Sequence, residues 1–327
     1  MATSKYKRHV PTDGARRRLV TYVAITAFVL VDVALIAWAV NSTRAVPAAP
    51  QAVQAPMVVP TAEPVETTAP EPSATPAVTL TEAATPTRVI TALNATTAWR
   101  AETGPCPATT ASPEYTLNGG VTWSTTDATG PTGVTAIQSI IVEADGIASM
   151  VGLAGAGCAP EFIKTFVAGD NYRVYEEQLA ATWHLSADDL TITSPSGLVD
   201  SPCAEVVGLA HASVTQAAVL CRDQNVYLTE SAGVDWSEAI ALPNAIGISV
   251  ADAGYRWASA GGDGCAGIKF GSIAADSATA GTGCLVTPVT ADQLAQTTSI
   301  SEADGALWVW SQDTLERSLD GGATWEP

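Results

Sequence analysis

Basic residues are scarce beyond the first 44 positions of this 327-residue chain. From Ala45 onward, 8 lysines and arginines face 31 aspartates and glutamates, which gives this part a net charge of −23. Such an acidic surface repels nucleic acid and anionic lipid headgroups, whereas it attracts cationic partners and keeps a domain soluble. The charge therefore argues against a nucleic-acid-binding function.

The familiar catalytic motifs are missing as well. The sequence contains no GxSxG, no HExxH, no phosphate-binding P-loop and no dinucleotide-binding fingerprint. His184 and His211 have no recognisable serine or cysteine partner. Glycoside hydrolysis needs two carboxyl groups about 5 to 9.5 Å apart, which adjacency in sequence does not establish for the acidic pairs Glu176, Glu177, Asp188 and Asp189. We predict no catalysis, no cofactor and no bound metal.

Cysteine is absent from the first hundred residues and never occurs as a CxxC pair, which argues against a zinc site. The rest of the chain contains an even number of cysteines, and disulfides in an oxidising compartment account for them better than free thiols do. Several pairings are open. We favour the sequential set because it closes the shortest loops: Cys106 with Cys158, Cys203 with Cys221, and Cys265 with Cys284.

One long apolar run covers residues 19–40, and a single charge, Asp32, interrupts it. A helix of this length crosses a hydrocarbon core of about 30 Å. Basic residues concentrate before it, in residues 1–18, so the positive-inside rule places that tail in the cytoplasm and everything after the helix outside. The alternative is a signal peptide cleaved at the small-residue site Ala37 to Ala39, which would release a secreted protein.

Residues 41–86 have no hydrophobic periodicity and consist largely of alanine, proline, threonine, valine and glutamate. Recurrent proline removes backbone donors and favours extended geometry, so this segment is predicted to be a disordered, semi-rigid linker. Residues 87–327 differ: they contain short apolar runs such as AIQSIIVEA, QAAVLC and ALWVWS between clusters of turn residues. This pattern predicts an all-β, disulfide-bonded domain outside the cytoplasm.

Two octets form a repeat, TLNGGVTW at residues 116–123 and SLDGGATW at residues 318–325, and looser copies occur at residues 165–172 and 229–236. An Asx side chain accepts backbone hydrogen bonds in a turn, glycine adopts positive φ, and tryptophan buries a large ring. We therefore predict structural roles for Asn118, Gly119, Gly120, Thr122, Trp123, Asp320, Gly321, Gly322, Thr324 and Trp325.

These octets resemble the Asp-box, or BNR, repeat of sialidase-like β-propellers. The resemblance implies a structural corner between the third and fourth strands of a blade. The spacing of the aromatic ends predicts five blades, with six as the alternative, including one blade without an octet around residues 255–286. Little chain follows Trp325, so the strand around residues 89–93 is expected to complete the last blade. A β-sandwich is the alternative fold.

A sialidase would further require three arginines that grip a carboxylate, a tyrosine nucleophile with a glutamate partner, and an acid/base aspartate. Arg173, Arg222 and Arg256 are available, but no Arg-Ile-Pro motif is present. Trp308 and Trp310 alternate along a predicted strand, where packing between blades is favoured over stacking on a sugar.

The Ala- and Thr-rich composition is typical of actinobacteria, and the chain is interpreted as a membrane-anchored, non-catalytic propeller of that type. It is predicted to bind an unknown protein or glycan ligand outside the cytoplasm. The alternatives are a sialidase-like glycoside hydrolase and an assembly factor for an envelope complex.

Overall fold

The computed structural model describes residues 80–187, 191–262, 264–274, 277 and 279–327. Among these residues, no helix has both the length and the apolar character needed to cross a membrane. The membrane segment predicted at residues 19–40, with Asp32, and most of the predicted linker lie outside the described residues.

The described chain forms six antiparallel sheets, each a simple meander that we call a blade. Blade 1 contains β1 (Arg88–Ala92), β2 (Ala98–Glu102), β3 (Glu114–Thr116) and β4 (Ser124–Thr125). Blade 2 contains β5 (Val134–Ala144), β6 (Ile147–Ala154), β7 (Ala159–Thr165) and β8 (Arg173–Val174). Blade 3 contains β9 (His184–Leu185), β10 (Ile192–Ser194) and β11 (Gly197–Val199).

The second half of the ring follows the same plan. Blade 4 contains β12 (Val206–His211), β13 (Ala217–Cys221), β14 (Asn225–Thr229) and β15 (Ile240–Ala241). Blade 5 contains β16 (Ala245–Ala251), β17 (Gly254–Gly262), β18 (Cys265–Ile273) and β19 (Thr279–Val286). Blade 6 contains β20 (Thr298–Ala303), β21 (Ala306–Ser311) and β22 (Thr314–Ser318). Three short helices are described: α2 (Thr129–Thr132), α3 (Glu176–Leu179) and α4 (Ala291–Thr297).

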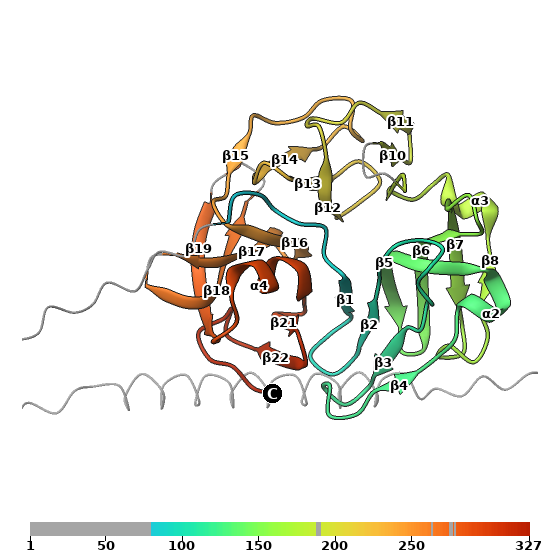
Figure 1. Ribbon diagram of the computed structural model, residues 1–327, viewed down its shortest axis with the longest axis horizontal. Helices are drawn as coiled ribbons and strands as arrows, with labels where there is room; N and C mark the ends of the chain where they lie inside the picture. Colours follow the sequence, from blue (N-terminus) through green and yellow to red (C-terminus); the bar gives the residue numbers. More distant parts are fainter. Residues whose placement is uncertain (1–79, 188–190, 263, 275–276, 278) are drawn as a thin grey trace, which may run out of the picture. The chain divides into compact units, whose positions relative to one another are not determined.

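The blades surround a common centre in sequence order, so the fold is a six-bladed β-propeller and not a β-sandwich (Figure 1). The predicted blade without an octet is blade 5. The count of five omitted blade 3, whose strands are two or three residues long and which also lacks an octet. Strands this short leave no alternating pattern for a sequence to show.

The hydrophobic core lies between blades. Middle strands such as β6, β13 and β21 are apolar and almost wholly buried, because a neighbouring blade covers each of their faces. One cluster, for example, joins Trp99 of blade 1 to Val134 and Met150 of blade 2. Similar clusters join blades 3 and 4, 4 and 5, 5 and 6, and 6 and 1. The ring is therefore stabilised blade against blade.

The predicted closure of the ring was wrong. The strand at residues 88–92 pairs with β2 as the innermost strand of blade 1 and does not complete the last blade. Instead, the chain end itself returns to blade 6, where Arg317 and Glu326 form an isolated bridge. The blade 6 to blade 1 boundary is joined by side chains: Trp308 Nε1 donates to Asn94 O at 3.1 Å, and Arg317 Nη1 donates to Ala95 O at 2.6 Å.

The linker boundary predicted at residue 86 is also too late. Leu80 and Ala83 are buried, and they belong to the clusters between blades 5 and 6 and between blades 4 and 5. Ala83 N donates to Arg222 O at 2.8 Å. Residues 80–86 are therefore part of the folded unit, and Leu80, the first leucine after residue 40, is the sequence signal that distinguishes them from the proline-rich stretch before.

Candidate functional site: the central channel

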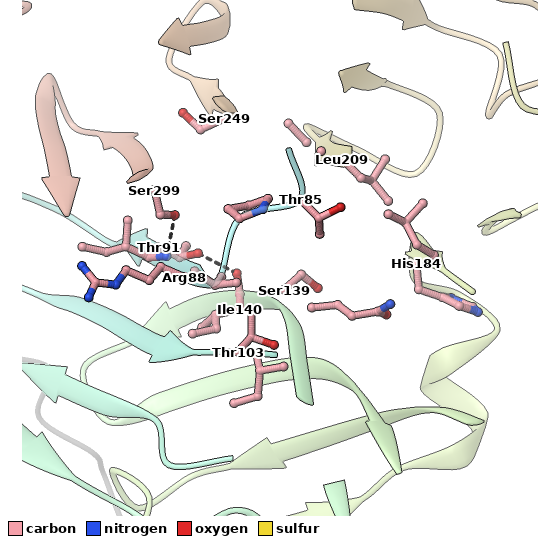
Figure 2. Close-up of a pocket in the computed structure, with 18 of the residues that line it drawn as sticks. Thr85, Arg88, Thr91, Thr103, Ser139, Ile140, His184, Leu209, Ser249 and Ser299 are labelled. Carbon is pink, nitrogen blue, oxygen red and sulfur yellow. Dashed lines mark hydrogen bonds between the residues drawn. The ribbon is translucent and has the colours of Figure 1, made fainter. Parts of the chain in front are cut away.

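A cavity of about 790 Å³ lies at the centre of the ring, and we call it the central channel (Figure 2). Residues from the first strand of every blade line it, namely β1, β5, β9, β12, β16 and β20. Its volume falls within the range of about 300 to 1,000 Å³ that is usual for ligand pockets. It is therefore the first place to look for a binding site.

The lining strands β1 and β20 run in the same direction. Ile90 N donates to Ser299 Oγ at 3.1 Å, and two residues further along both strands Ala92 N donates to Ser301 Oγ at 2.9 Å. At the boundary between blades 1 and 6, the backbone N–H groups of β1 are thus bonded to serine hydroxyls of β20 and not to its backbone carbonyls. Figure 2 shows the first of these bonds at the channel wall.

The same direction holds for neighbouring pairs. Thr91 Oγ1 donates to Ile140 O, and Thr97 Oγ1 to Asp145 Oδ1, both at 2.9 Å, so β1 and β5 advance together. Gly305 N donates to Asp252 Oδ2 at 3.0 Å, which aligns the ends of β16 and β20. The hairpin turns that follow these first strands therefore gather at one end of the channel, which we call the turn end.

The opposite end is crossed by residues 80–87, which we call the strap. Leu80 N donates to Asn244 Oδ1 and Gln224 Nε2 donates to Leu80 O, each at 2.8 Å. At the other end of the strap, Thr87 N donates to Gln296 O at 2.8 Å. The strap thus spans from blade 4 to blade 1, and its residues at 85–87 form part of the channel wall. We call this the strap end.

The three disulfides join the sequential pairs predicted above, Cys106 with Cys158, Cys203 with Cys221, and Cys265 with Cys284. The first of them links blade 1 to blade 2, and both of its cysteines belong to the channel wall. It ties together two loops that border the channel beside Thr103 and Pro105. The other two disulfides brace blades 4 and 5.

The channel wall mixes aliphatic side chains with hydroxyl groups (Figure 2). Three of its polar atoms are buried without a hydrogen-bond partner in the described part of the chain: Gln138 Oε1, Ser139 Oγ and Ser249 Oγ. A buried polar group left unpaired costs about 1 to 3 kcal/mol, so such atoms call for an explanation. A serine hydroxyl moves between staggered positions, and with no bond to lose it can turn toward a ligand in the channel.

The ionisable groups of the described wall are already engaged. Arg88 donates to Gln312 O and lies 4.6 Å from the centre of the Trp310 ring. Glu302 is ion-paired with Arg256. His184 Nδ1 lies 2.9 Å from Thr182 O, and burial lowers the pKa of His211. Arg88 is also ion-paired with Glu102, so both the arginine and the glutamate of the described wall have a partner of opposite charge.

The unpartnered polar residues of the channel wall were not predicted from the sequence, although one signal was present. Gln138 and Ser139 interrupt the apolar run AIQSIIV of β5. The register of β5 against β6 shifts between Ile137 and Ser139, so Gln138 occupies a β-bulge. Bulges re-aim side chains and are common beside functional sites. A polar pair within an apolar strand was the available clue.

The octets form identical corners, and we call them the corner octets. The first residue, Thr116 or Ser318, is buried, and its hydroxyl accepts hydrogen bonds from the backbone N–H of the third and fifth residues. At the fifth position this bond measures 3.0 Å in blade 1 and 2.7 Å in blade 6. Asn118 Oδ1 and Asp320 Oδ1 accept from the seventh residue at 3.0 and 2.8 Å.

The two looser copies have the same geometry. Thr165 and Thr229 are buried, and each accepts from the glycine at the fifth position, Gly169 at 2.9 Å and Gly233 at 3.0 Å. The fourth residue has positive φ in all four corners, although it is alanine in blades 2 and 4. The conserved features of the corner are thus the buried hydroxyl and the fifth-position glycine, more than the Asx residue.

The fifth-position glycine sits against the preceding blade. A Cβ on Gly120 would collide with Leu315 of blade 6, one on Gly169 with Thr126 after β4, and one on Gly233 with Val199 of blade 3. Gly322 similarly touches Gly283 of blade 5. Glycine is therefore required there by space as well as by φ.

The aromatic eighth residue also contacts the preceding blade. Trp325 Nε1 donates to Cys284 O at 2.9 Å, and Trp236 Nε1 donates to Asp200 O at 3.1 Å. Trp123 packs against the cluster between blades 6 and 1. Tyr172 is hydrogen-bonded to Thr126, and burial raises its pKa to about 12, so its phenol stays protonated. In the four blades that contain one, the corner octet joins the blade to the one before it.

No protein-family model matches the chain, and neither does any curated protein. Several solved structures align with a large part of the chain. They include YCF48 bound to D1 peptide, with 16% identity over 70% of this chain and a TM-score of 0.29. The GH74 xyloglucanase from Xanthomonas campestris has 15% identity over 73% and a TM-score of 0.29. The Aleuria aurantia lectin, in complex with Fucalpha1-6GlcNAc, has 7% identity over 77% and a TM-score of 0.48.

The chain spans 63% of YCF48, 38% of the xyloglucanase and 97% of the lectin. Their TM-scores are all below 0.5, so they carry no argument about this chain. The assignment of the propeller rests on the six sheets of this chain.

The residues considered for sialidase chemistry do not come together. Arg173 lies on β8, the outermost strand of blade 2. Arg222 donates to Glu205 and holds the pKa of that carboxyl below its ordinary value. Arg256 pairs with Glu302, as described above. Glu176 and Glu177 begin α3, away from the channel wall, and Asp188 and Asp189 lie outside the described residues.

Trp308 and Trp310 are packed between blades. Trp308 is wholly buried and Trp310 is 6% exposed, and both belong to the cluster between blades 6 and 1. Neither ring is available as a stacking platform for a sugar. Within the described residues, no group of acidic, histidine or cysteine side chains is arranged to hold a metal ion.

Proposed function

We propose that this protein is a non-catalytic binding protein that takes its ligand into the central channel. The observation that carries the proposal is a set of polar atoms in the channel wall that have no hydrogen-bond partner among the described residues, namely Gln138 Oε1, Ser139 Oγ and Ser249 Oγ. They accompany an aliphatic surface around a cavity of about 790 Å³. Ligand sites characteristically combine an apolar wall with a few polar groups that fix orientation.

The ionisable groups support binding over hydrolysis. Hydrolysis of a glycosidic bond uses two carboxyl groups, one of them as a proton donor. Glu302 is the one carboxylate among the described residues that line the channel, and it is ion-paired with Arg256, so the described wall does not supply the pair of carboxyl groups that this chemistry uses. The phenol of Tyr172 serves a blade contact and not the channel.

We further infer that the four corner octets are Asp-boxes and that the chain is a non-catalytic relative of the sialidase-like propellers, of actinobacterial type. Support comes from the shared corner geometry of Thr116, Thr165, Thr229 and Ser318. In this proposal the boxes hold blades together, and ligand specificity resides in the first strands.

The propeller is proposed to sit outside the cytoplasm, held by a membrane helix at residues 19–40. Its three disulfides support an oxidising compartment. An immunoblot of membrane and medium fractions tests the anchor. We expect the full-length protein in the membrane fraction, accessible to protease added to intact cells. A shortened form in the medium would favour cleavage after residue 39 instead.

The binding proposal is tested by blocking the channel. Ser249→Trp places a large ring in the channel wall, whereas Ser124→Trp adds the same ring to the exposed outer strand β4. The full-length chain in detergent is screened against a displayed peptide library and a glycan array. We expect ligands whose binding falls at least tenfold in Ser249→Trp and stays unchanged in Ser124→Trp. Equal binding by both variants contradicts the proposal.

The hydrolase alternative is tested on the same preparation with fluorogenic glycosides. We expect no turnover above a heat-denatured control. Turnover that is lost on substitution of Arg256 but kept after substitution of the exposed Arg173 would replace binding by catalysis as the function.

A further inference from the structure

The central channel reaches solvent beside the strap. Thr85, Thr87 and Pro105 belong to its lining and are exposed, whereas most of the other lining residues are buried or half-buried. The loop that contains Pro105 adjoins the strap, since Thr103 N donates to Thr87 O at 2.8 Å. A ligand therefore has an entrance at the strap end.

At two boundaries of the ring, hydroxyl groups in the channel wall are bonded to the backbone of the neighbouring lining strand. Ile90 N and Ala92 N of β1 donate to serine hydroxyls of β20. Thr91 Oγ1 of β1 in turn donates to Ile140 O of β5. Each lining strand lies at the edge of its sheet, so the backbone groups on its free side need such partners. The partner of a wall hydroxyl at these boundaries is thus the backbone of an extended segment.

At the next boundary, between blades 2 and 3, the lining strand that follows is short. β9 has 2 residues, whereas the other lining strands have 5 to 11. Ser139 of β5 lines the channel, and its buried Oγ has no hydrogen-bond partner in the described chain. The same holds for Oε1 of Gln138, which occupies the bulge beside it. Within the described structure, these two polar groups thus lack the extended backbone that bonds wall hydroxyls at the two preceding boundaries.

The Ser139 side chain points toward blade 3. Ile140 belongs to the cluster between blades 1 and 2, and successive side chains of a strand alternate between its two sides. The cavity extends to the blade 3 side, because its lining includes Leu185 of β9 and Leu209 of β12, both half-buried. Figure 2 shows Ser139, His184 and Leu209 at this part of the wall. The place beside β5 is therefore open to a ligand and bordered by aliphatic side chains.

The lining also restricts the chemistry of the ligand. Apart from histidine, the ionisable side chains of the described lining are Arg88 and Glu302, and each is ion-paired. Trp183 is the one tryptophan, tyrosine or phenylalanine among these residues, and it is 2% exposed. A charged ligand would meet no unpaired carboxylate, lysine or arginine here, and a sugar would find no exposed ring of these types to stack on. An uncharged chain with aliphatic side chains suits this wall.

We propose that the central channel takes up an extended, uncharged peptide segment, which lies beside β5 in the place left by the short β9 and donates backbone N–H groups to the Ser139 hydroxyl and Gln138 Oε1. This inference rests on the proposed channel function and adds the class and the position of the ligand. Strand addition of this kind gains affinity from main-chain hydrogen bonds, while alternate side chains fill pockets. Leu185 and Leu209 border the place where those side chains would lie.

The test compares matched hydroxyl deletions in the full-length chain. Ser139→Ala removes the hydroxyl beside blade 3, and Ser249→Ala removes a hydroxyl of the channel wall in blade 5 that likewise has no partner in the described chain. Ser139→Thr keeps a hydroxyl at the first place. Thermal unfolding checks that all variants are folded.

The probe is a fluorescein-labelled hexapeptide of alternating serine and valine, titrated and followed by fluorescence anisotropy. Two further versions carry N-methyl groups on either the serine or the valine amides. Hexapeptides with lysine or glutamate in place of serine test charge, and labelled cellohexaose is the uncharged glycan of equal unit number.

We expect the unmodified chain to bind the serine–valine hexapeptide about tenfold more tightly than the charged peptides and cellohexaose. Ser139→Ala should weaken binding roughly fivefold, as the loss of one hydrogen bond does, whereas Ser139→Thr and Ser249→Ala should stay within about twofold. One N-methylated version should bind much more weakly than the other, because alternate backbone groups of a strand face opposite edges. Failure of the hexapeptide to bind, equal losses in Ser139→Ala and Ser249→Ala, or equal binding of both N-methylated versions overturns the inference.

Ser249→Trp separates this inference from the proposed function. Hexapeptide binding that survives Ser249→Trp lies outside the channel and overturns the inference. Library or array ligands that are lost in Ser249→Trp but bind Ser139→Ala as tightly as the unmodified chain leave the binding function standing and remove the peptide beside β5. Hexapeptide binding that is lost in Ser249→Trp and weakened in Ser139→Ala supports the proposal.

Discussion

The corner octets and the central channel are built on opposite principles. Four blades place a buried hydroxyl at the start of the corner and a positive-φ glycine at its fifth position. The channel wall repeats nothing of this kind: its strands present serine in blades 5 and 6, a bulged glutamine in blade 2 and histidine in blades 3 and 4. The corner geometry is repeated because the packing of one blade against the next makes similar demands at these boundaries. The side chains of the channel wall differ from blade to blade, as expected for a binding site in which each blade contacts a different part of the ligand.

The two regions also treat buried polar atoms differently. At the corners, each first-position hydroxyl accepts two backbone N–H groups, so its burial is compensated. In the channel, the Ser139 and Ser249 hydroxyls are buried without partners in the described chain. Stability is concentrated at the corners, and the channel retains groups that lower stability unless something binds them.

The largest expected effect concerns the corner glycine of blade 2. Gly169→Ala combines the strain of a side chain at φ of +84° with a collision against Thr126 of blade 1. Strain at positive φ costs about 1 to 2 kcal/mol, and overpacking typically adds about 1 to 3 kcal/mol. We expect a loss of about 3 kcal/mol in the free energy of unfolding, measured by urea denaturation followed by tryptophan fluorescence.

Gly321→Ala is the matched control. Its φ is also positive, at +74°, but a Cβ there meets nothing within 4 Å. Alanine already occupies the equivalent position in blades 2 and 4, as Ala168 and Ala232. We expect a loss of about 1 kcal/mol. If both variants lost the same free energy of unfolding, contact with the preceding blade would not be the reason why the fifth position requires glycine.

The same residues explain which parts of the fold could be predicted from the sequence. The octets with Gly120 and Gly322 were recognisable in the sequence because positive φ and the close approach of the preceding blade leave room for glycine alone at this position. The third strand of blade 3 has three residues, and no periodic pattern can emerge from so few. Blade 3 was therefore missed, and the predicted closure by residues 89–93 failed since Glu326 completes that edge.

The channel was beyond the reach of sequence reasoning for a different reason. Ser249 and Gln138 are separated by more than a hundred residues and meet only because the ring brings first strands together. Within its own strand, each is a single polar residue that indicates no binding site.

The second prediction makes the same substitution in both regions. Ser318→Ala removes the corner hydroxyl that accepts from Gly322 N at 2.7 Å and leaves that buried N–H unpaired. We expect a loss of about 2 kcal/mol in unfolding free energy. Ser249→Ala removes a hydroxyl that has no partner in the described chain, so stability should stay the same or rise by about 1 kcal/mol. A loss at Ser249 as large as that at Ser318 contradicts the distinction between the two regions.

The smallest expected effect is a pH dependence that distinguishes two corners of the same shape. Asp320 accepts hydrogen bonds from Thr324 N, the Thr324 hydroxyl, the Ser318 hydroxyl and Ala323 N, which together lower its pKa from 3.8 to about 2. In blade 1 the same place is held by Asn118, which does not titrate.

Because the folded pKa of Asp320 lies below its unfolded value, the carboxylate stabilises the fold above pH 3.8 and that contribution is lost as the pH falls toward about 2. Asp320→Asn should therefore be less stable than the unmodified chain near neutral pH, and the difference should shrink over this acidic window. Asn118→Asp should introduce the same dependence in blade 1. Unfolding free energies measured across the window decide the matter, and a stability difference that stays constant with pH would show that the charge at the third position of the corner has no role.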